Sequence, residues 1–348
     1  MIPSFPRRAA AALLATLALA PVAPVAQAQD NKVLNLYSAR HYDTDEALYT
    51  NFTKSTGIRI NRIEMGDEAL LERLRNEGTN SPADVILIVD AARLHTAEQA
   101  GLFAPVKSAV LEQRIPKELR SPASTWFAFS SRARVLVYSK SGAFPQDVQT
   151  YEDLAAPRNK GKVCTRPGSH PYMLSLVASV IAHDGEQAAE QWARATVANM
   201  ARPPRGGDTD QIKAVASGEC AVALTNSYYL VRLMRSKKPE DQAVVSRIGM
   251  VWPNQASYGT HINVSGGAMA KHAPNKEAAV KFLEYLASDE AQAYFANGNN
   301  EWPVVKSVKP RNAELESLGT FKADALPIAE IAARTPAAQK LVDRAGWR

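Results

Sequence analysis

Two adjacent tyrosines, Tyr228 and Tyr229, lie where an apolar segment gives way to an amphipathic one. Residues 220–224 are typical of a short buried strand, and residues 230–234 continue with helical spacing. Residues 225–227 (Thr-Asn-Ser) are all favourable N-cap residues, so the sequence predicts both tyrosines in the first turn of a helix. A helix N-terminus carries unpaired N–H groups and a partial positive charge, which stabilise an anion. The pair is therefore a candidate metal site built from phenolates.

Two further strand-to-helix junctions carry tyrosines: Tyr42 follows a predicted strand at 33–37, and Tyr172 follows one at 162–165. In open α/β sheets ligands bind outside the carboxyl ends of the strands, where such junctions lie. Phenolate is a hard oxygen ligand that suits trivalent iron. Because a free tyrosine has a pKa near 10, deprotonation at neutral pH needs the charge of the metal. The alternative is that these rings pack and their hydroxyls form ordinary hydrogen bonds.

Charged and imidazole side chains near these junctions provide further candidates. His41, next to Tyr42, adds a possible neutral nitrogen ligand. Arg132 and Arg134 flank a β-rich stretch, where they could hold a small anion or support phenolates. The alternative for both is a surface position on an alternating strand. His170, just before a predicted helix, is interpreted as an N-cap or as a residue that contacts the ligands and not the metal.

The two cysteines repeat the spacing of the tyrosines, since Cys164 precedes Tyr172 by eight residues and Cys220 precedes Tyr228 by eight. In an exported chain the two thiols could pair. If their strands are neighbours, the disulfide would hold the two tyrosine-bearing loops in register. Chain entropy alone predicts a stabilisation of about 4 kcal/mol for a loop of this length. The alternative is two buried free thiols.

The first 28 residues are predicted to be a cleaved signal peptide. Arg7 and Arg8 precede an alanine-rich apolar run that is too short to span a bilayer, and residues 26–28 (Ala-Gln-Ala) fit a cleavage site. We therefore expect an exported, soluble protein located in the periplasm. Without these two arginines, the 41 basic residues become 39 against 35 acidic ones, a mild net charge of +4. No basic tract of the kind that binds nucleic acid is present.

Motifs typical of enzymes are missing from the sequence. It has no Gly-x-Ser-x-Gly elbow, no His-Glu-x-x-His, no Walker loop and no Gly-x-Gly-x-x-Gly. An exported enzyme would also need an activated nucleophile or an acid/base pair, and none stands out. These absences agree with a binding protein that is not an enzyme.

The periodicity alternates between strands and helices and predicts an α/β fold with parallel sheets. The first half should contain strands at 33–37, 58–63 and 85–89, and helices from an Asp43/Glu46 capping box to 55, at 68–76 and at 91–100. The second half should contain strands at 162–165 and 220–224, and helices at 171–182, 186–200, 208–216 and 275–286, with a mostly helical stretch from 326.

Two β-rich segments, near 126–140 and 252–270, separate and rejoin these α/β units. A chain that crosses twice between two lobes forms a hinge and an interlobe cleft. The expected N-terminal lobe is 29–130 plus about 260–305. The expected C-terminal lobe is about 131–259 plus 306–348.

Four segments resemble the periplasmic ferric-iron-binding proteins, the solute receptors of bacterial iron ABC importers: residues 34–42 (LNLYSARHY), 81–85 (SPADV), 132–138 (RARVLVY) and 226–229 (NSYY). The resemblance covers essentially the whole mature chain. It implies two α/β lobes that close over a cleft about a hinge. It further implies a monomeric receptor that delivers ferric iron to an inner-membrane ABC permease with its ATPase.

The resemblance also implies roles for individual residues. The implied metal ligands are Tyr228, Tyr229, His41, Tyr42 and Tyr172. Arg134 resembles an arginine used by members that hold a carbonate, and Arg40 would serve the same anion or the second shell. A carboxylate ligand of another branch would fall where this chain has Val89 followed by Asp90. The alternative function is the same fold binding a small organic solute such as a polyamine or phosphonate, which would favour aromatic walls and charged clamps.

Overall fold

The computed structural model describes Met1 and residues 32–40, 42–142 and 148–348, without the side chain of Asp43. The predicted signal peptide beyond Met1 and the candidate ligand His41 lie outside the described residues. Across these ranges no helix is both long enough and apolar enough to cross a membrane.

The described strands form one ten-stranded sheet with the order β2-β1-β3-β9-β5-β7-β6, in which β10 and β8 pair with β5 and β4 pairs with β9. Their bounds are β1 Val33–Ser38, β2 Arg59–Glu64, β3 Val85–Val89, β4 Phe103–Ala104, β5 Trp126–Ser139, β6 Val163–Cys164, β7 Val222–Asn226, β8 Ile248–Val251, β9 Ile262–Ala270 and β10 Trp302–Pro303. Strand β1 is parallel to β2 and β3, and β6 is parallel to β7. The expectation of purely parallel sheets is wrong, because β9 is antiparallel to β3 and β5, and β5 is antiparallel to β7. The predicted α/β class is confirmed.

Strand β5 belongs to both halves of the sheet. Its first part pairs with β9 as far as Ala133, opposite Ile262. Its second part pairs with β7, starting at Arg134 opposite Asn226. All of its residues except Tyr138 are buried, so the predicted β-rich segment is a core strand. One continuous strand thus crosses between the two α/β units, as the sequence predicts.

Helices cover the sheet on both sides of this crossing strand. In the first half of the chain they are α1 Glu46–Thr56, α2 Asp67–Glu77, α3 Ala91–Gln99 and α4 Ala109–Arg114, with 3-10 turns at Asp43–Asp45, Gly78–Asn80 and Lys117–Leu119. In the middle they are α5 Pro171–Asp184, α6 Glu186–Ala198, α7 Asp208–Ser217, α8 Ser227–Arg235 and α9 Pro239–Arg247, with 3-10 turns at Glu152–Ala155 and Pro157–Asn159. Towards the C-terminus they are α10 Lys276–Leu286, α11 Asp289–Asn299, α12 Ala313–Ser317, α13 Ile328–Ala333 and α14 Thr335–Ala345.

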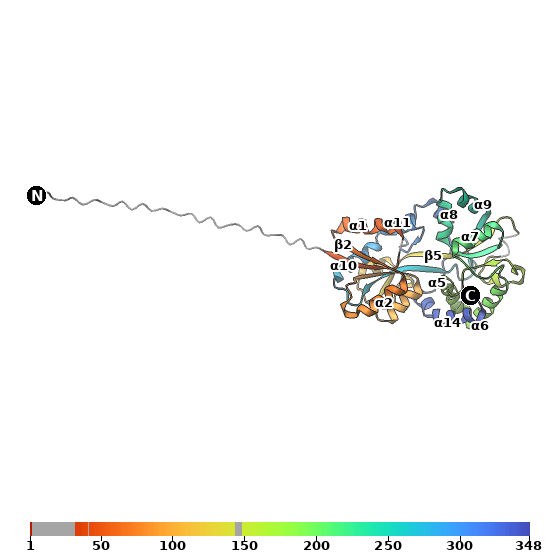
Figure 1. The fold of residues 1–348 in the computed structure, drawn as a ribbon, viewed down its shortest axis with the longest axis horizontal. Coiled ribbons are helices and arrows are strands. Elements are labelled where there is room, and N and C mark those ends of the chain that lie inside the picture. The colour runs from red at the N-terminus through yellow and green to blue at the C-terminus, as the bar shows by residue number, and fades with distance from the viewer. Residues whose placement is uncertain (2–31, 41, 143–147) are drawn as a thin grey trace. The chain divides into compact units, whose positions relative to one another are not determined.

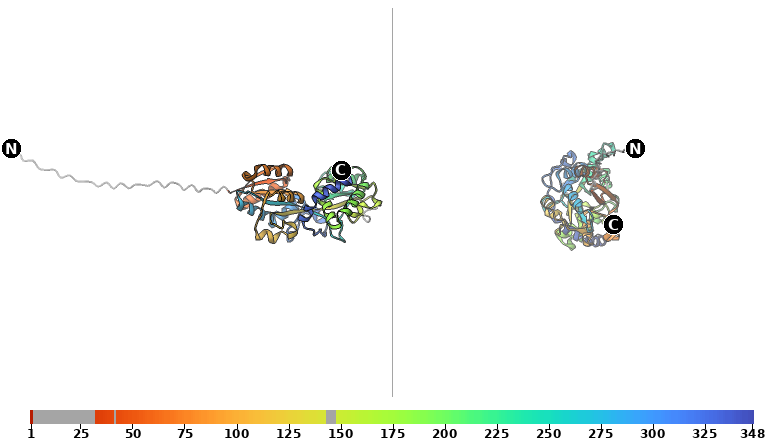
Figure 2. Two further views of the ribbon diagram at one scale, coloured as in Figure 1. Left: turned by 90° about the horizontal axis from the view of Figure 1, so that it is seen from below. Right: turned by 90° about the vertical axis from the view of Figure 1, so that its left-hand side faces the viewer.

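Two groups of helices lie on either side of the crossing strand in Figure 1, and the left view of Figure 2 shows the same separation. Helices α1, α2 and α10 lie around β1 and β2, whereas α7, α8 and α9 lie at the other end of β5. Helix α14, near the C-terminus, returns to pack on α5 and α6. The ends of β1, β6 and β7 then present the three predicted tyrosine junctions.

Most predicted helices are confirmed within a few residues, but the start of α1 differs. The predicted Asp43/Glu46 capping box depends on the Asp43 side chain, which lies outside the described part of the chain, and α1 itself begins at Glu46 after a 3-10 turn at Asp43–Asp45. The Asp45 carboxylate accepts a hydrogen bond from Arg40 Nε at 2.8 Å. The Asp45 side chain is therefore part of a buried ion pair and does not cap the helix. The predicted end of α1 at Gly57 is confirmed, with φ at +72°.

Candidate metal centre

Tyr228 and Tyr229 lie in the first turn of α8, as predicted, because β7 ends at Asn226 and α8 begins at the next residue. The N-cap residue is Asn226, but its side chain does not cap the helix. Its Oδ1 instead accepts a hydrogen bond from Arg134 Nη1 at 3.2 Å. The two tyrosine rings lie against each other with centres 4.2 Å apart. Tyr228 is buried, whereas Tyr229 is partly exposed.

Tyr172 occupies the same kind of position on α5, directly after Pro171. His170 is the N-cap, and its Nδ1 accepts a hydrogen bond from the Tyr172 backbone N–H at 3.2 Å. The predicted capping role of His170 is thus confirmed. Burial, followed by the charges of Arg166 and two more distant arginines, lowers the pKa of His170 to about 3, so the ring stays neutral.

The tyrosines of the three junctions come together in one place. The hydroxyl oxygens of Tyr172 and Tyr228 lie 3.4 Å apart. Burial raises the pKa of Tyr228, and negative charge on Tyr42, Tyr172 and Tyr229 raises it further. Arg40, over the Tyr42 ring, and Arg132, over the Tyr172 ring, both contact Glu301, so Tyr42 lies near the other tyrosines although it follows β1.

Arginines surround the four rings. The guanidinium carbon of Arg40 lies 4.8 Å from the ring centre of Tyr42. Arg132 lies 5.5 Å and Arg166 5.0 Å from the ring centre of Tyr172. Arg232 lies 5.3 Å from the ring centre of Tyr229. The charge of Arg132 lowers the pKa of Tyr42, Tyr172 and Tyr228, but burial outweighs it and all three phenols have raised pKa values.

The predicted alternative that Arg132 and Arg134 are surface residues is wrong, since both are about 1% exposed. Arg134 Nη1 donates to Asp208 Oδ2 at 2.6 Å, and its Nη2 contacts the Met173 sulfur at 3.0 Å. Arg132 donates to Ser265 Oγ at 2.7 Å. Alternating polar and apolar residues suggested an exposed face, but both faces of β5 are covered.

Glu301 is a part of this environment that the sequence reasoning missed. It is 1% exposed and lies between two arginines, 3.4 Å from Arg40 Nη1 and 3.5 Å from Arg132 Nη1. Ser130 Oγ donates a hydrogen bond to it at 2.7 Å. Glu301 follows α11 in a segment without any motif, so only the folded chain reveals its partners.

Carboxylates are not the obvious metal donors here. Asp90, which follows Val89, accepts hydrogen bonds from the Ala92 backbone N–H and from Asn263 Nδ2, both at 2.8 Å, so both of its oxygens are engaged. Within the described ranges, no group of three or more His, Cys, Asp or Glu residues could hold a metal ion. The phenols are the oxygen donors that the fold gathers.

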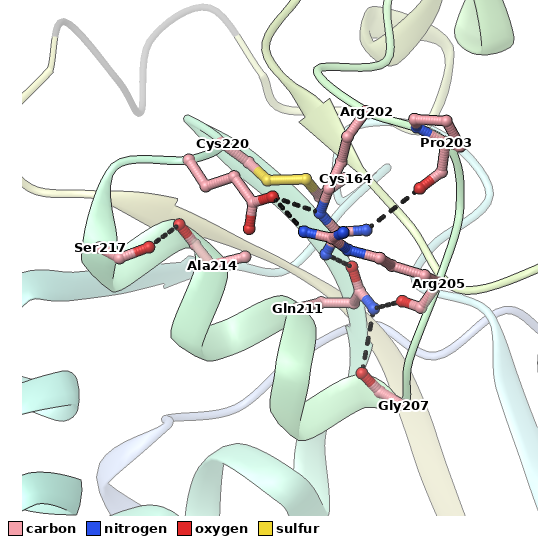
Figure 3. The surroundings of a disulfide bond; sticks show 10 residues. Cys164, Arg202, Pro203, Arg205, Gly207, Gln211, Ala214, Ser217 and Cys220 are labelled. Atoms are coloured by element: carbon pink, nitrogen blue, oxygen red, sulfur yellow. Dashed lines mark hydrogen bonds and ion pairs between the residues drawn. A yellow bond between two sulfur atoms is a disulfide. The ribbon is translucent and has the colours of Figure 1, made fainter.

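Cys164 and Cys220 form a disulfide, with their Cα atoms 5.8 Å apart. Both are buried, and Figure 3 shows the bond beside Gln211 of α7. Strands β6 and β7 are parallel neighbours, with Cys164 opposite Ala223. The predicted pairing is confirmed, and the alternative of two free thiols is wrong. The disulfide therefore joins the end of β6, which leads to Tyr172, to the segment just before β7, which leads to Tyr228.

Comparison with known families agrees with this architecture. The family model described as bacterial extracellular solute-binding protein matches residues 47–324. This chain belongs to that family. Among its relatives is iron uptake protein A1 of Synechocystis sp., which is 47% identical over 337 residues, covering 97% of this chain and 93% of the relative. The major ferric iron-binding protein of Neisseria meningitidis is 27% identical over 317 residues, covering 90% of this chain and 93% of the relative.

A solved structure similar to this chain, Trichodesmium FutA (IdiA) in complex with iron and citrate ligands, is 52% identical with a TM-score of 0.88. The match covers 91% of this chain and 100% of that structure. The resemblance predicted from the four sequence segments is confirmed, and so is the two-lobe periplasmic-binding-protein fold.

Proposed function

We propose that this protein is a receptor for ferric iron, which it binds in the interlobe cleft through the phenolates of four tyrosines, Tyr42, Tyr172, Tyr228 and Tyr229. The observation that carries the proposal is the 3.4 Å approach of the Tyr172 and Tyr228 hydroxyl oxygens, with the Tyr229 ring packed against the Tyr228 ring. The printed names of the relatives, which refer to iron uptake and ferric iron, support the same cargo. They favour iron over a polyamine or phosphonate.

The electrostatics of the cluster support a trivalent cation as cargo. Burial raises the pKa of Tyr42, Tyr172 and Tyr228, so in the empty receptor these phenols keep their protons. A ferric ion supplies the positive charge that stabilises several adjacent phenolates. Each phenol that becomes a ligand releases a proton, so binding is linked to pH. The buried Arg132 offsets part of the remaining negative charge.

The sequence resemblance suggests the remaining coordination. We propose that His41 is an additional nitrogen ligand and that carbonate completes the shell. Arg134 already binds Asp208 and Asn226, and Arg40 binds Asp45. We therefore assign to both arginines the role of orienting the tyrosine ligands without contacting the metal.

The family and the sequence together suggest the biological setting. We propose that the signal peptide directs the chain to the periplasm, where the protein acts as a monomer and catalyses no reaction. It would hand its iron to an inner-membrane ABC permease with its ATPase. The two lobes, 29–130 plus about 260–305 and about 131–259 plus 306–348, would close over the cargo by bending at β5 and the other crossings.

The test uses the colour of iron–phenolate charge transfer. The purified receptor titrated with ferric citrate should develop a red-orange absorption band. Replacing both Tyr228→Phe and Tyr229→Phe should abolish the band and weaken ferric binding. Tyr285→Phe is a matched control, because the Tyr285 hydroxyl is buried without a hydrogen-bond partner in α10. A colourless wild-type protein, or a double variant with unchanged ferric affinity, would refute the proposed function.

A further inference from the structure

One buried carboxylate, that of Asp208, accepts hydrogen bonds from the segments that precede Tyr172 and Tyr228. Asp208, the first residue of α7, is fully buried. Its Oδ2 accepts hydrogen bonds from Arg134 Nη1 at 2.6 Å and from the Asn226 backbone N–H at 2.7 Å. Its Oδ1 accepts one from Arg166 Nη1 at 3.2 Å. Three donors from three separate segments thus satisfy a single side chain.

Two of these donors belong to the tyrosine junctions themselves. Asn226 is the N-cap of α8 and lies two residues before Tyr228. Arg166 is in the loop between β6 and α5, and its guanidinium carbon lies 5.0 Å from the centre of the Tyr172 ring. Asp208 therefore links the start of α8 to the group that covers Tyr172.

The third donor closes the network. Arg134, on the crossing strand β5, also donates to Asn226 Oδ1 at 3.2 Å and contacts the Met173 sulfur at 3.0 Å. Met173 directly follows Tyr172 in α5. The Asp208 carboxylate and the Arg134 guanidinium together connect β5, α5, α7 and α8. None of the side chains in this network is a proposed iron ligand.

We propose that Asp208 is a positioning residue for ferric binding: it fixes the start of α8 against the start of α5, so that the Tyr172 and Tyr228 hydroxyls point to one site. This inference rests on the proposed ferric function. Groups behind metal ligands that orient them typically affect metal affinity by about 10- to 100-fold. Asp208 acts on Tyr228 through its hydrogen bond with the Asn226 backbone N–H. It acts on Tyr172 through Arg166, which contacts the Tyr172 ring.

The charge of Asp208 and its positioning role predict opposite results. Asp208 is linked to the Tyr172 ring through Arg166, and a negative charge there opposes phenolate formation by Coulomb repulsion. If Asp208 acted only through its charge, Asp208→Asn would favour the phenolate and strengthen ferric binding. If Asp208 positions the junctions, the same substitution weakens ferric binding because Arg134 and Arg166 lose their common anchor.

The experiment titrates the full-length mature protein with ferric citrate and records affinity and the charge-transfer band. We expect Asp208→Asn to lower ferric affinity by about 10- to 100-fold and to shift the band. The matched control is Asp84→Asn, since Asp84 is also fully buried and accepts backbone N–H groups of Asn35 at 2.7 Å and Asn275 at 2.6 Å, away from the tyrosines. Asp84→Asn should lower the melting temperature but leave the affinity and the band of the folded protein unchanged.

Three outcomes would overturn the inference. Unchanged or tighter ferric binding by Asp208→Asn, with wild type showing the band, refutes the inference alone. A wild type without any band refutes the proposed function, and the inference with it. If Asp208→Asn does not fold, Arg166→Gln at the 12% exposed rim tests the same link, and unchanged affinity and an unchanged band there also refute the inference.

Discussion

The hydroxyl oxygens of Tyr172 and Tyr228 lie 3.4 Å apart although the two residues are 56 positions apart in the chain. Parallel pairing of β6 and β7 explains this proximity, because both strands end at the same edge of the sheet and each leads into a helix. Tyr172 follows Pro171 at the start of α5, and Tyr228 follows Ser227 at the start of α8. Two helix N-termini thus face one site, where their partial positive charges favour phenolates.

Tyr172→Phe should weaken ferric binding and reduce the charge-transfer band. The substitution removes one proposed oxygen ligand but keeps the ring, which packs against His170 with centres 4.5 Å apart. Because a direct ligand is lost, we expect ferric affinity to fall by about 100-fold or more, beyond the typical effect of an outer-shell change. Titration with ferric citrate measures the affinity, and the melting temperature of the iron-free protein reports the fold.

The control for this prediction is Tyr285→Phe, which removes a buried hydroxyl without a hydrogen-bond partner. It should leave both the affinity and the band unchanged. Wild-type affinity in Tyr172→Phe would show that this hydroxyl is not a ligand, even if the paired tyrosines of α8 are.

Much of this site was predictable because local signals agree with the fold. The apolar run Val85–Val89 is β3 with the predicted bounds, and Pro171 opens α5 as expected. Strand-to-helix junctions predicted that the tyrosines lie at one edge of the sheet, and two cysteines in an exported chain predicted the disulfide. These features depend on neighbours in the sequence or on the regular edge of a parallel sheet.

Other parts could not be predicted because their partners are distant in the sequence. Glu301 lies beside Arg40, 261 positions away, and Asp208 binds Arg134, 74 positions away. The polar positions of β5 resemble an exposed strand face until helices from both lobes cover it. Helix α11 was not predicted, since its last turn contains Asn297, Gly298 and Asn299, residues that disfavour helices and are stabilised here by tertiary contacts.

Ferric binding and the stability of the iron-free protein should respond oppositely to pH. Because ligand phenols must lose protons, lowering the pH should release iron and bleach the band. Without iron, burial raises the pKa of Tyr42, Tyr151 and Tyr228 in the folded state. Their contribution to stability is complete below the unfolded pKa near 10 and is lost as the pH rises towards the folded value.

Two measurements check this prediction. The charge-transfer absorbance of loaded protein should fall as the pH is lowered, with proton release on loading detected in weakly buffered solution. The melting temperature of the iron-free protein should fall above about pH 10, where the unfolded chain ionises first. Iron loading that is independent of pH would contradict the phenolate model.

Removing the disulfide should destabilise the protein. The bond closes a loop between positions separated by 56 residues, for which chain entropy predicts about 4 kcal/mol and native strain usually leaves about 2–4 kcal/mol. Replacing Cys164→Ser and Cys220→Ser together should lower the free energy of unfolding in guanidinium by that amount. The wild type with its disulfide reduced under denaturing conditions is the control and should lose a similar amount of stability. An unfolding midpoint of the double variant equal to that of the oxidised wild type would contradict the prediction.

Glu301→Ala should destabilise the fold more than the loss of a surface carboxylate does. Glu301 is buried between Arg40 and Arg132, so its removal leaves two buried cations with weaker compensation. Breaking a buried pair by deleting one partner costs about 3–5 kcal/mol, whereas an exposed pair contributes about 0–1 kcal/mol. The matched control is Glu330→Ala, whose exposed side chain lies 3.6 Å from Arg334. Denaturant unfolding of both variants measures the two losses of unfolding free energy. Similar small losses would contradict the prediction, because Asp45 and Ser265 alone would then be sufficient partners for Arg40 and Arg132.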